Sequence, residues 1–148
     1  MHEIKQINFL RDHPGGNFPA YESVSPDAAH SLRGRIGARL GLDRKDDSVV
    51  FAHTLTAREA PVSGVGANAD DKSFDILEVF GRLGIAPLEQ VYVNWRVFLD
   101  VDRLATRDVA KFFSYLWYPG PDAIDIFDES CQWVVSIEPD GYVAYVRF

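Results

Sequence analysis

The nine residues from Val91 to Leu99, VYVNWRVFL, restrict the possible folds more than any other segment. Apolar residues of one face, Val91, Val93 and Trp95, alternate with Tyr92 and other residues of the opposite face. A period of two residues is typical of a β-strand. Three more short strands are expected at 123–127, 132–138 and 142–148, with turn-forming residues at 139–141 between the last two. The second half of the chain therefore predicts an antiparallel sheet that ends in a β-meander.

Helical signals lie before and between these strands. The clearest begins with Ser25 as N-cap and Pro26 at the first helical position, and it ends near Gly41, which predicts a helix over 26–40. Its outer face carries three arginines at 33, 35 and 39. A second helix is expected within 70–85 and a third over 106–117. The inward positions expected for them are Phe74, Leu77, Phe80 and Leu83 in the second, and Val109, Phe112, Phe113 and Leu116 in the third, which Thr106 would cap.

Between the first two helices, the residues Ser48–Thr56, SVVFAHTLT, predict a strand because β-branched and aromatic residues are frequent in strands. The following run, 57–71, has a proline, small residues and no period, so it predicts a long exposed loop. We therefore expect an α+β fold in which residues 1–148 form a single globular domain, with helices packed on the antiparallel sheet.

Composition limits the setting. No apolar run approaches the roughly 18 residues that a membrane helix needs, and the N-terminal segment lacks the apolar stretch of a signal peptide. Cys131 is the only cysteine, so no internal disulfide can form. Its apolar neighbours suggest a buried side chain and not a reactive thiol. A cytoplasmic protein is expected.

The negative charge is concentrated in one half of the chain. Residues 1–69 contain eight acidic and eight basic side chains, whereas residues 70–148 contain fourteen acidic and seven basic ones, so the whole net charge of −7 arises there. An acidic surface repels nucleic acid and attracts basic proteins. We expect a basic protein partner and no direct binding to nucleic acid.

Four carboxylates lie close together in the sequence, at Asp122, Asp125, Asp128 and Glu129. With a rise of about 3.3 Å per residue, a strand separates the first and third of them by about 20 Å, too far to surround one metal ion. The same spacing argues against an acid/base pair formed by these residues alone. We therefore expect no metal and no cofactor. Asp122, Asp128 and Glu129 should lie in the turns that flank a strand and Asp125 within it, and we expect the four carboxylates to form a solvated docking surface, with Tyr118 as an exposed aromatic beside them.

Other residues offer weaker chemistry. His13 and His53 could meet in space and act with an aspartate in a small hydrolase or nuclease. Asp100 and Asp102 share a face and could together bind a cation, but the favoured interpretation is an ordinary strand end in which Asp102 pairs with Arg103 or Arg107. The chain contains no phosphate-binding loop, dinucleotide fingerprint, zinc spacing or nucleophile elbow.

The run FFSYLWYPGPDAIDIFDESCQWVVSIEPDGYV, residues 112–143, resembles the C-terminal segment of bacterial immunity proteins that accompany polymorphic and contact-dependent growth-inhibition toxins. The shared features are a helix that ends in Tyr-Pro, a strand that ends in Ile-Phe-Asp, a tryptophan strand and a turn. The resemblance implies a non-enzymatic protein that binds and neutralises a cognate toxin domain, often a basic nuclease. The alternatives are the histidine-based hydrolase and a domain that binds a small ligand. The sequence leaves the toxin, the contact face and the oligomeric state open.

Overall fold

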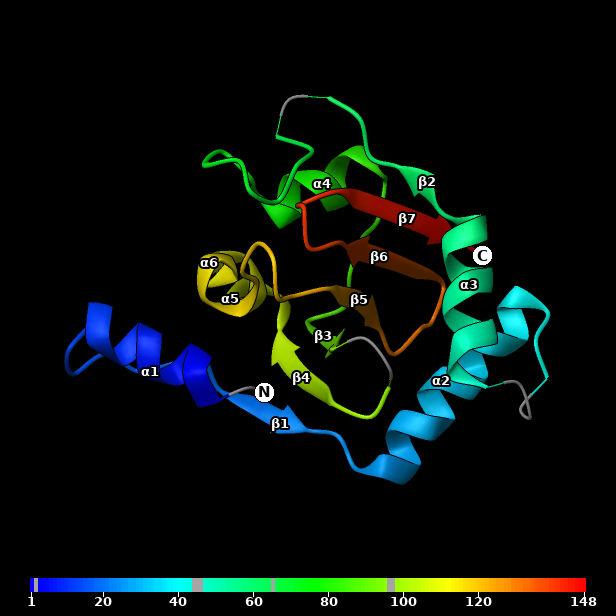
Figure 1. Cartoon of the computed structure of the whole chain (residues 1–148), viewed down its shortest axis with the longest axis horizontal. Helices are drawn as coiled ribbons and strands as arrows, with labels where there is room; N and C mark the ends of the chain where they lie inside the picture. The colour runs from blue at the N-terminus through cyan, green and yellow to red at the C-terminus, as the bar shows by residue number, and fades with distance from the viewer. Residues whose placement is uncertain (2, 44–46, 65, 96–97) are drawn as a thin grey trace.

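The computed structural model describes residues 1, 3–43, 47–64, 66–95 and 98–148. Across these residues the chain forms six helices and a seven-stranded sheet (Figure 1). The helices are α1 (Glu3–Asp12), α2 (Pro26–Leu40), α3 (Ser48–Arg58), α4 (Ile76–Arg82), α5 (Thr106–Lys111) and α6 (Phe113–Leu116). The strands are β1 (Tyr21–Ser23), β2 (Ala60–Pro61), β3 (Gln90–Asn94), β4 (Val101–Ala105), β5 (Ile124–Asp128), β6 (Trp133–Ile137) and β7 (Val143–Arg147).

All neighbouring strands are antiparallel, in the order β1-β4-β3-β5-β6-β7-β2. The last three strands follow one another as the expected meander, and Gly141 supplies the positive φ of 82° in the turn between β6 and β7. The α+β class, the antiparallel sheet and the C-terminal meander are therefore confirmed. None of the helices in the described residues combines the length and the apolarity needed to cross a membrane.

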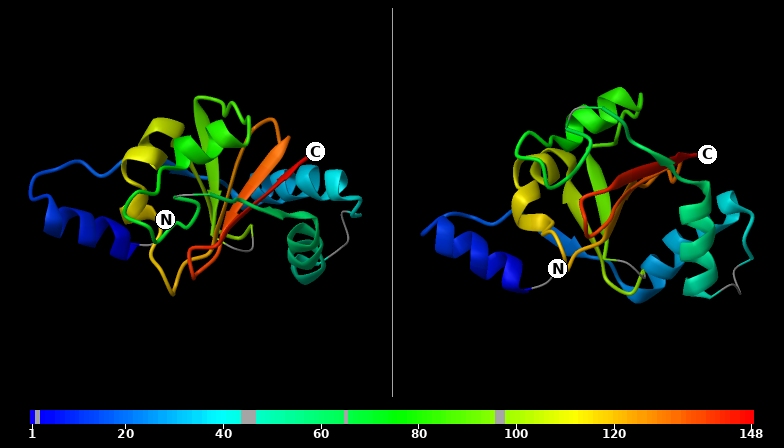
Figure 2. Two further views of the ribbon diagram at one scale, coloured as in Figure 1. Left: turned by 90° about the horizontal axis from the view of Figure 1, so that it is seen from above. Right: turned by 45° about the horizontal axis from the view of Figure 1, so that its top comes forward.

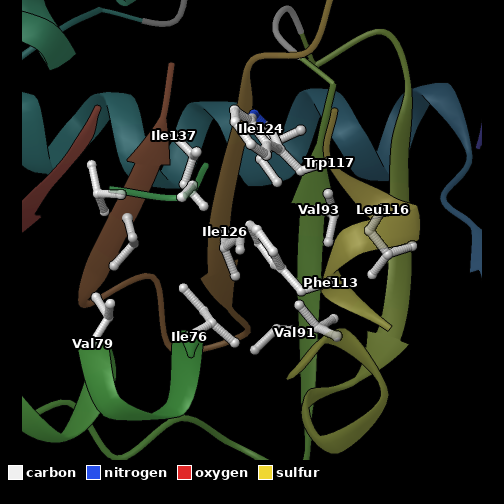
Figure 3. Close-up of a cluster of buried hydrophobic side chains, with 14 of the residues drawn as sticks. Ile76, Val79, Val91, Val93, Phe113, Leu116, Trp117, Ile124, Ile126 and Ile137 are labelled. Atoms are coloured by element: carbon white, nitrogen blue, oxygen red, sulfur yellow. The ribbon is translucent and has the colours of Figure 1, made fainter. Parts of the chain in front are cut away.

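Helices cover both faces of the sheet, with α4, α5 and α6 on one side and α2 and α3 on the other (Figure 2). Alternate residues of each central strand supply the two cores, as the strand period requires. The first core joins Ile76, Val79, Phe113, Leu116 and Trp117 to the sheet residues Val91, Val93, Ile124, Ile126 and Ile137 (Figure 3). In the second core, Leu32, Ile36, Phe51 and Leu55 pack against Tyr92, Phe127 and Val134.

Helix α2 has the predicted bounds because both of its ends are specified locally. The Ser25 hydroxyl accepts a hydrogen bond from the Ala28 N–H at 3.3 Å, and Gly41 closes the helix with a left-handed φ of 81°. Such caps satisfy backbone groups that the helix leaves unpaired at its ends. The helix prediction over 26–40 is confirmed.

The strand predicted at Ser48–Thr56 is wrong, because this segment is the core of helix α3. The Asp47 side chain accepts hydrogen bonds from the N–H groups of Val49 and Val50, each at 2.9 Å, and starts the helix. Phe51 and Leu55, four residues apart, then share the face that packs on the sheet. The cap and this pair outweigh the strand preference of the β-branched residues, of which Val49 remains 74% exposed.

The strand predicted over 91–99 is too long at its C-terminal end. Strand β3 stops at Asn94, whose side-chain oxygen accepts the N–H of Phe98 at 2.8 Å, while the Trp95 N–H donates to the Asp100 carbonyl at 2.9 Å. These bonds turn the chain back into β4; residues 96 and 97 of the predicted strand lie outside the described residues. The alternating pattern did not indicate that the side chain of Asn94 could accept a backbone N–H and so end the strand in a turn.

The other two predicted helices are shorter than expected. Helix α4 starts only after its N-cap, Asp75, and it buries Ile76, Val79 and Phe80 while Leu77 is 45% exposed. The third helix breaks at Phe112 into α5 and α6. Thr106 is not its cap, because the Thr106 hydroxyl donates to the Leu88 carbonyl at 2.6 Å.

The expectation of a long exposed loop over 57–71 is wrong at the start of the run, whereas Asp70 and Asp71 at its end are exposed and lie in a turn, as predicted. The first two residues of the run, 57 and 58, belong to the end of helix α3. Ala60 and Pro61 then form strand β2, which pairs with β7. The Val62 N–H donates to the Val143 carbonyl at 2.9 Å, and the Ala69 N–H donates to the Gly141 carbonyl at 2.8 Å. Both Val62 and Ala69 are buried, so the chain is fixed to the edge of the sheet at these two residues.

Candidate functional site: a groove between helix α3 and the sheet

A groove runs between α3 and the strands β5 and β6, with a volume of about 330 Å³. One wall is the helix face that carries Phe51 and Leu55, and the other is the sheet around Ile124. The polar groups in the groove are the side chains of Glu59, Asp125, Ser136 and Glu138. The groove is therefore an apolar cleft with carboxylates on its floor, and small-molecule and side-chain pockets of proteins have this general composition.

A row of polar side chains crosses the sheet below this groove. Asn94 on β3 lies opposite Asp125 on β5, which lies opposite Ser136 on β6. The Asn94 amide donates to one oxygen of Asp125 at 2.8 Å, and the Ser136 hydroxyl donates to the other at 2.8 Å. Because directly opposed residues in antiparallel strands share a face, the register alone brings the three side chains together. Asn94 and Ser136 are buried, so this polar row lies inside the fold.

Glu59 continues the row at its open end. It is the C-cap residue of α3, where its N–H bonds to the Leu55 carbonyl, and its carboxyl group contacts the Ser136 hydroxyl. The pKa of Glu59 is raised from an ordinary 4.5 to about 7: burial is the largest cause, the nearby negative charges of Asp125 and Glu138 also raise it, and the hydrogen bond with Ser136 opposes the shift. Within the described part of the chain, no basic side chain pairs with Glu59.

The Ser136 hydroxyl lies between the two carboxyl groups of this row. This hydroxyl carries one proton, yet it lies within hydrogen-bonding distance of carboxyl oxygens from both Glu59 and Asp125. With both carboxyls ionised, one contact would place two acceptors against each other. A proton on Glu59 removes this conflict, because Glu59 then donates to Ser136 while Ser136 donates to Asp125. With a pKa of about 7, Glu59 is about half protonated at neutral pH, and its protonated form is the one that removes the conflict at Ser136.

Two chemical roles suit such an arrangement. A carboxyl with a pKa of about 7 can give or accept a proton at neutral pH. It can also exchange its proton for a cationic side chain that enters the groove. Among the described residues, no group of three or more His, Cys, Asp or Glu side chains is arranged to hold a metal ion.

Of the residues predicted as a docking surface, Asp122 and Tyr118 belong to a different contact. The Asp122 carboxylate lies 2.5 Å from the ammonium of Lys5, a side chain of α1 that is 1% exposed. It also accepts the Tyr118 N–H at 2.8 Å, and the Lys5 ammonium lies 4.4 Å from the centre of the Tyr118 ring. Tyr118 is half-buried, so the prediction that it is an exposed aromatic is wrong. These residues attach α1 to the rest of the fold.

Asp128 and Glu129 have structural partners of their own. Asp128 is 1% exposed and accepts the N–H groups of Leu88 at 3.1 Å and Ser130 at 2.9 Å. Glu129 is exposed, bonds to the Tyr92 hydroxyl at 2.5 Å and pairs with Arg35. Thus only Glu129 has the solvated position expected of all four carboxylates, and only Asp125 lies in the α3 groove.

The remaining sequence candidates do not form sites. The His13 ring contacts the Tyr115 hydroxyl, just after the end of α1, whereas His53 is exposed on α3. Helices α1 and α3 lie at opposite ends of the molecule, so the two histidines do not meet (Figure 1). Asp102 is buried and accepts hydrogen bonds from Ser23 at 2.7 Å and from Trp95 at 2.9 Å. Cys131 is buried as predicted, and burial raises the pKa of its thiol.

A second, more polar cleft of about 400 Å³ lies between α2 and the β3–β4 strands. Its charged groups already satisfy one another, since Arg35 pairs with Glu129 and Arg103 with Glu22. We therefore regard the α3 groove as the better candidate site.

Sequence reasoning missed Glu59 and Ser136. Ser136 is the one polar residue in the apolar strand WVVSI, which was the available signal. No sequence signal marked Glu59, because its neighbourhood was interpreted as a strand followed by a loop. Comparisons with protein-family models, with curated proteins and with solved structures find no match to this chain.

Proposed function

We propose that this protein is a cytoplasmic immunity protein that binds and neutralises a basic toxin domain, without catalysis of its own. The observation that carries the proposal is the α3 groove, in which the carboxyl of Glu59 lies in an apolar cleft with no basic partner among the described residues. A lysine or arginine side chain of the toxin would enter the groove and take the place of the proton on Glu59.

Physical chemistry favours this exchange. A hydrogen bond between a carboxylate and a cationic side chain is stronger than one between neutral groups, and the apolar walls of the groove limit screening by water. The acidic excess of residues 70–148 would add long-range attraction and raise the association rate. The site and the overall charge thus favour the same class of partner.

The resemblance of residues 112–143 to immunity proteins is independent support. That segment spans α6, β5 and β6, and it contributes Asp125 and Ser136 to the groove. The part of the chain that resembles immunity proteins is therefore also the part that forms the floor of the candidate site.

The test uses the chain with a photo-crosslinking amino acid in place of Thr56, which lines the groove. Irradiation in cells of the source organism should capture a basic protein, and co-expression of the chain should protect a host from that protein. Glu59→Lys should abolish both capture and protection, whereas Glu89→Lys, at an exposed carboxylate away from the groove, should preserve both. Capture of an acidic protein, or protection that survives Glu59→Lys, would contradict the proposal.

One observation favours a second candidate, a small hydrolase. The pKa of Glu59, about 7, and the adjacent Asp125 provide a proton donor and a carboxylate in one groove. In that case the purified protein should turn over a substrate from a panel of phosphodiesters, esters and glycosides between about pH 5 and 8, with Glu59→Gln removing the activity. Absence of turnover across the panel, together with protection by the unmodified chain, would leave the binding function as the explanation.

A further inference from the structure

Helix α1 presents its apolar side chains to solvent and its lysine to the protein interior. Ile4, Ile7 and Leu10 are 54%, 52% and 47% exposed, whereas Lys5 and Phe9 are 1% and 3% exposed. A surface helix of a folded domain ordinarily buries its apolar stripe, so this orientation requires an explanation.

The orientation is fixed by the inward face. The Lys5 ammonium pairs with Asp122 at 2.5 Å and lies 4.8 Å from the centre of a ring of Trp95. One turn further along, the Phe9 ring contacts Phe112 and Tyr115 at centroid distances of 5.6 and 5.3 Å. Rotation of α1 to bury its isoleucines would break these contacts, so the apolar stripe is held outward.

The outward stripe lies at one end of the molecule. In both Figure 1 and Figure 2, α1 extends from the body beside α6, and its outer side faces away from the sheet. At about 100° per residue, Glu3, Ile4, Ile7, Leu10 and Arg11 share an arc of about 120° on this side. The exposed face is thus an apolar centre with an acidic residue at one end and a basic residue at the other.

The order of these residues is symmetric about Ile7. Glu3 and Arg11 are equally far from Ile7 along the helix, as are Ile4 and Leu10. An antiparallel copy of the same helix, related by a two-fold axis at Ile7, would therefore place apolar residues on apolar residues and each glutamate beside an arginine. A parallel copy would instead place like charges together.

We propose that α1 is a self-association surface, which pairs antiparallel with α1 of a second copy of this chain. Such an interface uses the same patch on both subunits, as closed two-fold dimers do. The antiparallel arrangement also opposes the two helix dipoles. Arg11 pairs with Asp12 at 2.9 Å within the chain, but both side chains are exposed, so this ion pair costs little to exchange.

The dimer should be weak and concentration-dependent. A helix of ten residues is about 15 Å long, so the helix pair alone buries much less than the roughly 1,200 Å² of a stable interface. Because of the two-fold axis, each substitution acts twice, and single substitutions should have large effects on the dissociation constant.

The test is sedimentation velocity on the full chain between about 5 and 500 μM, the range in which small interfaces associate. The sedimentation coefficient should rise with concentration, and Ile7→Lys should remove the rise. Glu3→Arg and Arg11→Glu should each weaken association about tenfold, and the double reversal should restore it, because the charges are then exchanged but still complementary. Val49→Lys, at a similarly exposed position on α3, is the matched control and should associate like the unmodified chain.

Circular dichroism and thermal melting check that each variant is folded. A sedimentation coefficient that does not change up to about 500 μM would overturn the proposal. The proposal would also be overturned if the exposed apolar face of α1 bound only a different protein. Association that survives Ile7→Lys, or a double reversal that fails to restore it in a folded protein, would also overturn it.

Discussion

Replacement of Glu59 by glutamine should make the protein more stable at alkaline pH and leave its stability at acidic pH almost unchanged. The pKa of Glu59 is about 7 in the folded protein and 4.5 as its ordinary value, so the folded state holds a proton that the unfolded chain has released between these two values. Each increase of pH in this window therefore lowers the free energy of unfolding, and the loss is complete once the pH exceeds the folded pKa. Glutamine, which resembles the protonated carboxyl and does not titrate, avoids this loss.

The size of the effect follows from the shift. A difference of one pKa unit corresponds to about 1.4 kcal/mol, so the interval from 4.5 to about 7 corresponds to about 3 kcal/mol. At about pH 4.5 the two proteins should therefore unfold at nearly the same urea concentration. At about pH 8 the midpoint of the Glu59→Gln variant should be about 1 to 2 M urea higher, since proteins of this size lose about 2 kcal/mol per molar urea.

The assay is equilibrium unfolding in urea at several values of pH, followed by tryptophan fluorescence. Glu89→Gln, at an exposed carboxylate, controls for the loss of one negative charge and should change the stability by less than about 0.5 kcal/mol at every pH. Equal stability differences between Glu59→Gln and the unmodified protein at all values of pH would refute the proton assignment. A less stable variant at about pH 8 would refute it as well.

Three further substitutions test the fold around the site. Lys5→Met should cost about 3 kcal/mol or more, measured by urea unfolding, because it leaves the Asp122 carboxylate without its buried partner; an unchanged midpoint would contradict the ion pair. Asp128→Ala should lower the melting temperature by several degrees, because it removes a buried carboxylate that accepts two partly buried N–H groups, and a melt like that of the unmodified chain would show that the carboxylate is dispensable. Gly141→Ala should lower the free energy of unfolding in urea by at least about 1 kcal/mol, since φ is 82° and the new Cβ would lie 2.1 Å from the Asn68 side-chain oxygen. Equal stability would show that Asn68 is not fixed against Gly141.

The parts of the fold that could be predicted from the sequence are those whose signals are local. Ser25, Pro26 and Gly41 specify the ends of α2 through their own backbone preferences, and the alternating strands with the turn at 139–141 specify the meander. The segment over 48–58 could not be assigned correctly, because its residues favour a strand and only the Asp47 cap and the contact of Phe51 with the sheet select a helix. Helix α1 escaped prediction because its inward face contains a lysine, which is buried only through a partner 117 residues away.

The candidate site shows the same division. Asp125 was identified from its acidic neighbourhood, but its actual neighbours, Asn94 and Ser136, are determined by strand register. Glu59 reaches this row only because α3 ends above β6. The expectation that these carboxylates are solvated is wrong for Asp128, which is buried beside backbone donors, and a spacing of carboxylates in sequence does not reveal such an environment.

The central claim, that the α3 groove accepts a cationic side chain, is tested most directly by a titration of the ¹⁵N-labelled protein with a blocked arginine peptide. The matched control is the same peptide with citrulline, which keeps the shape and loses the charge. The expected result is a set of amide shifts confined to residues of the groove, such as Glu59, Asp125 and Ser136, that weaken as the pH falls below the pKa of Glu59, about 7. Equal shifts with citrulline, or shifts located elsewhere on the protein, would contradict it.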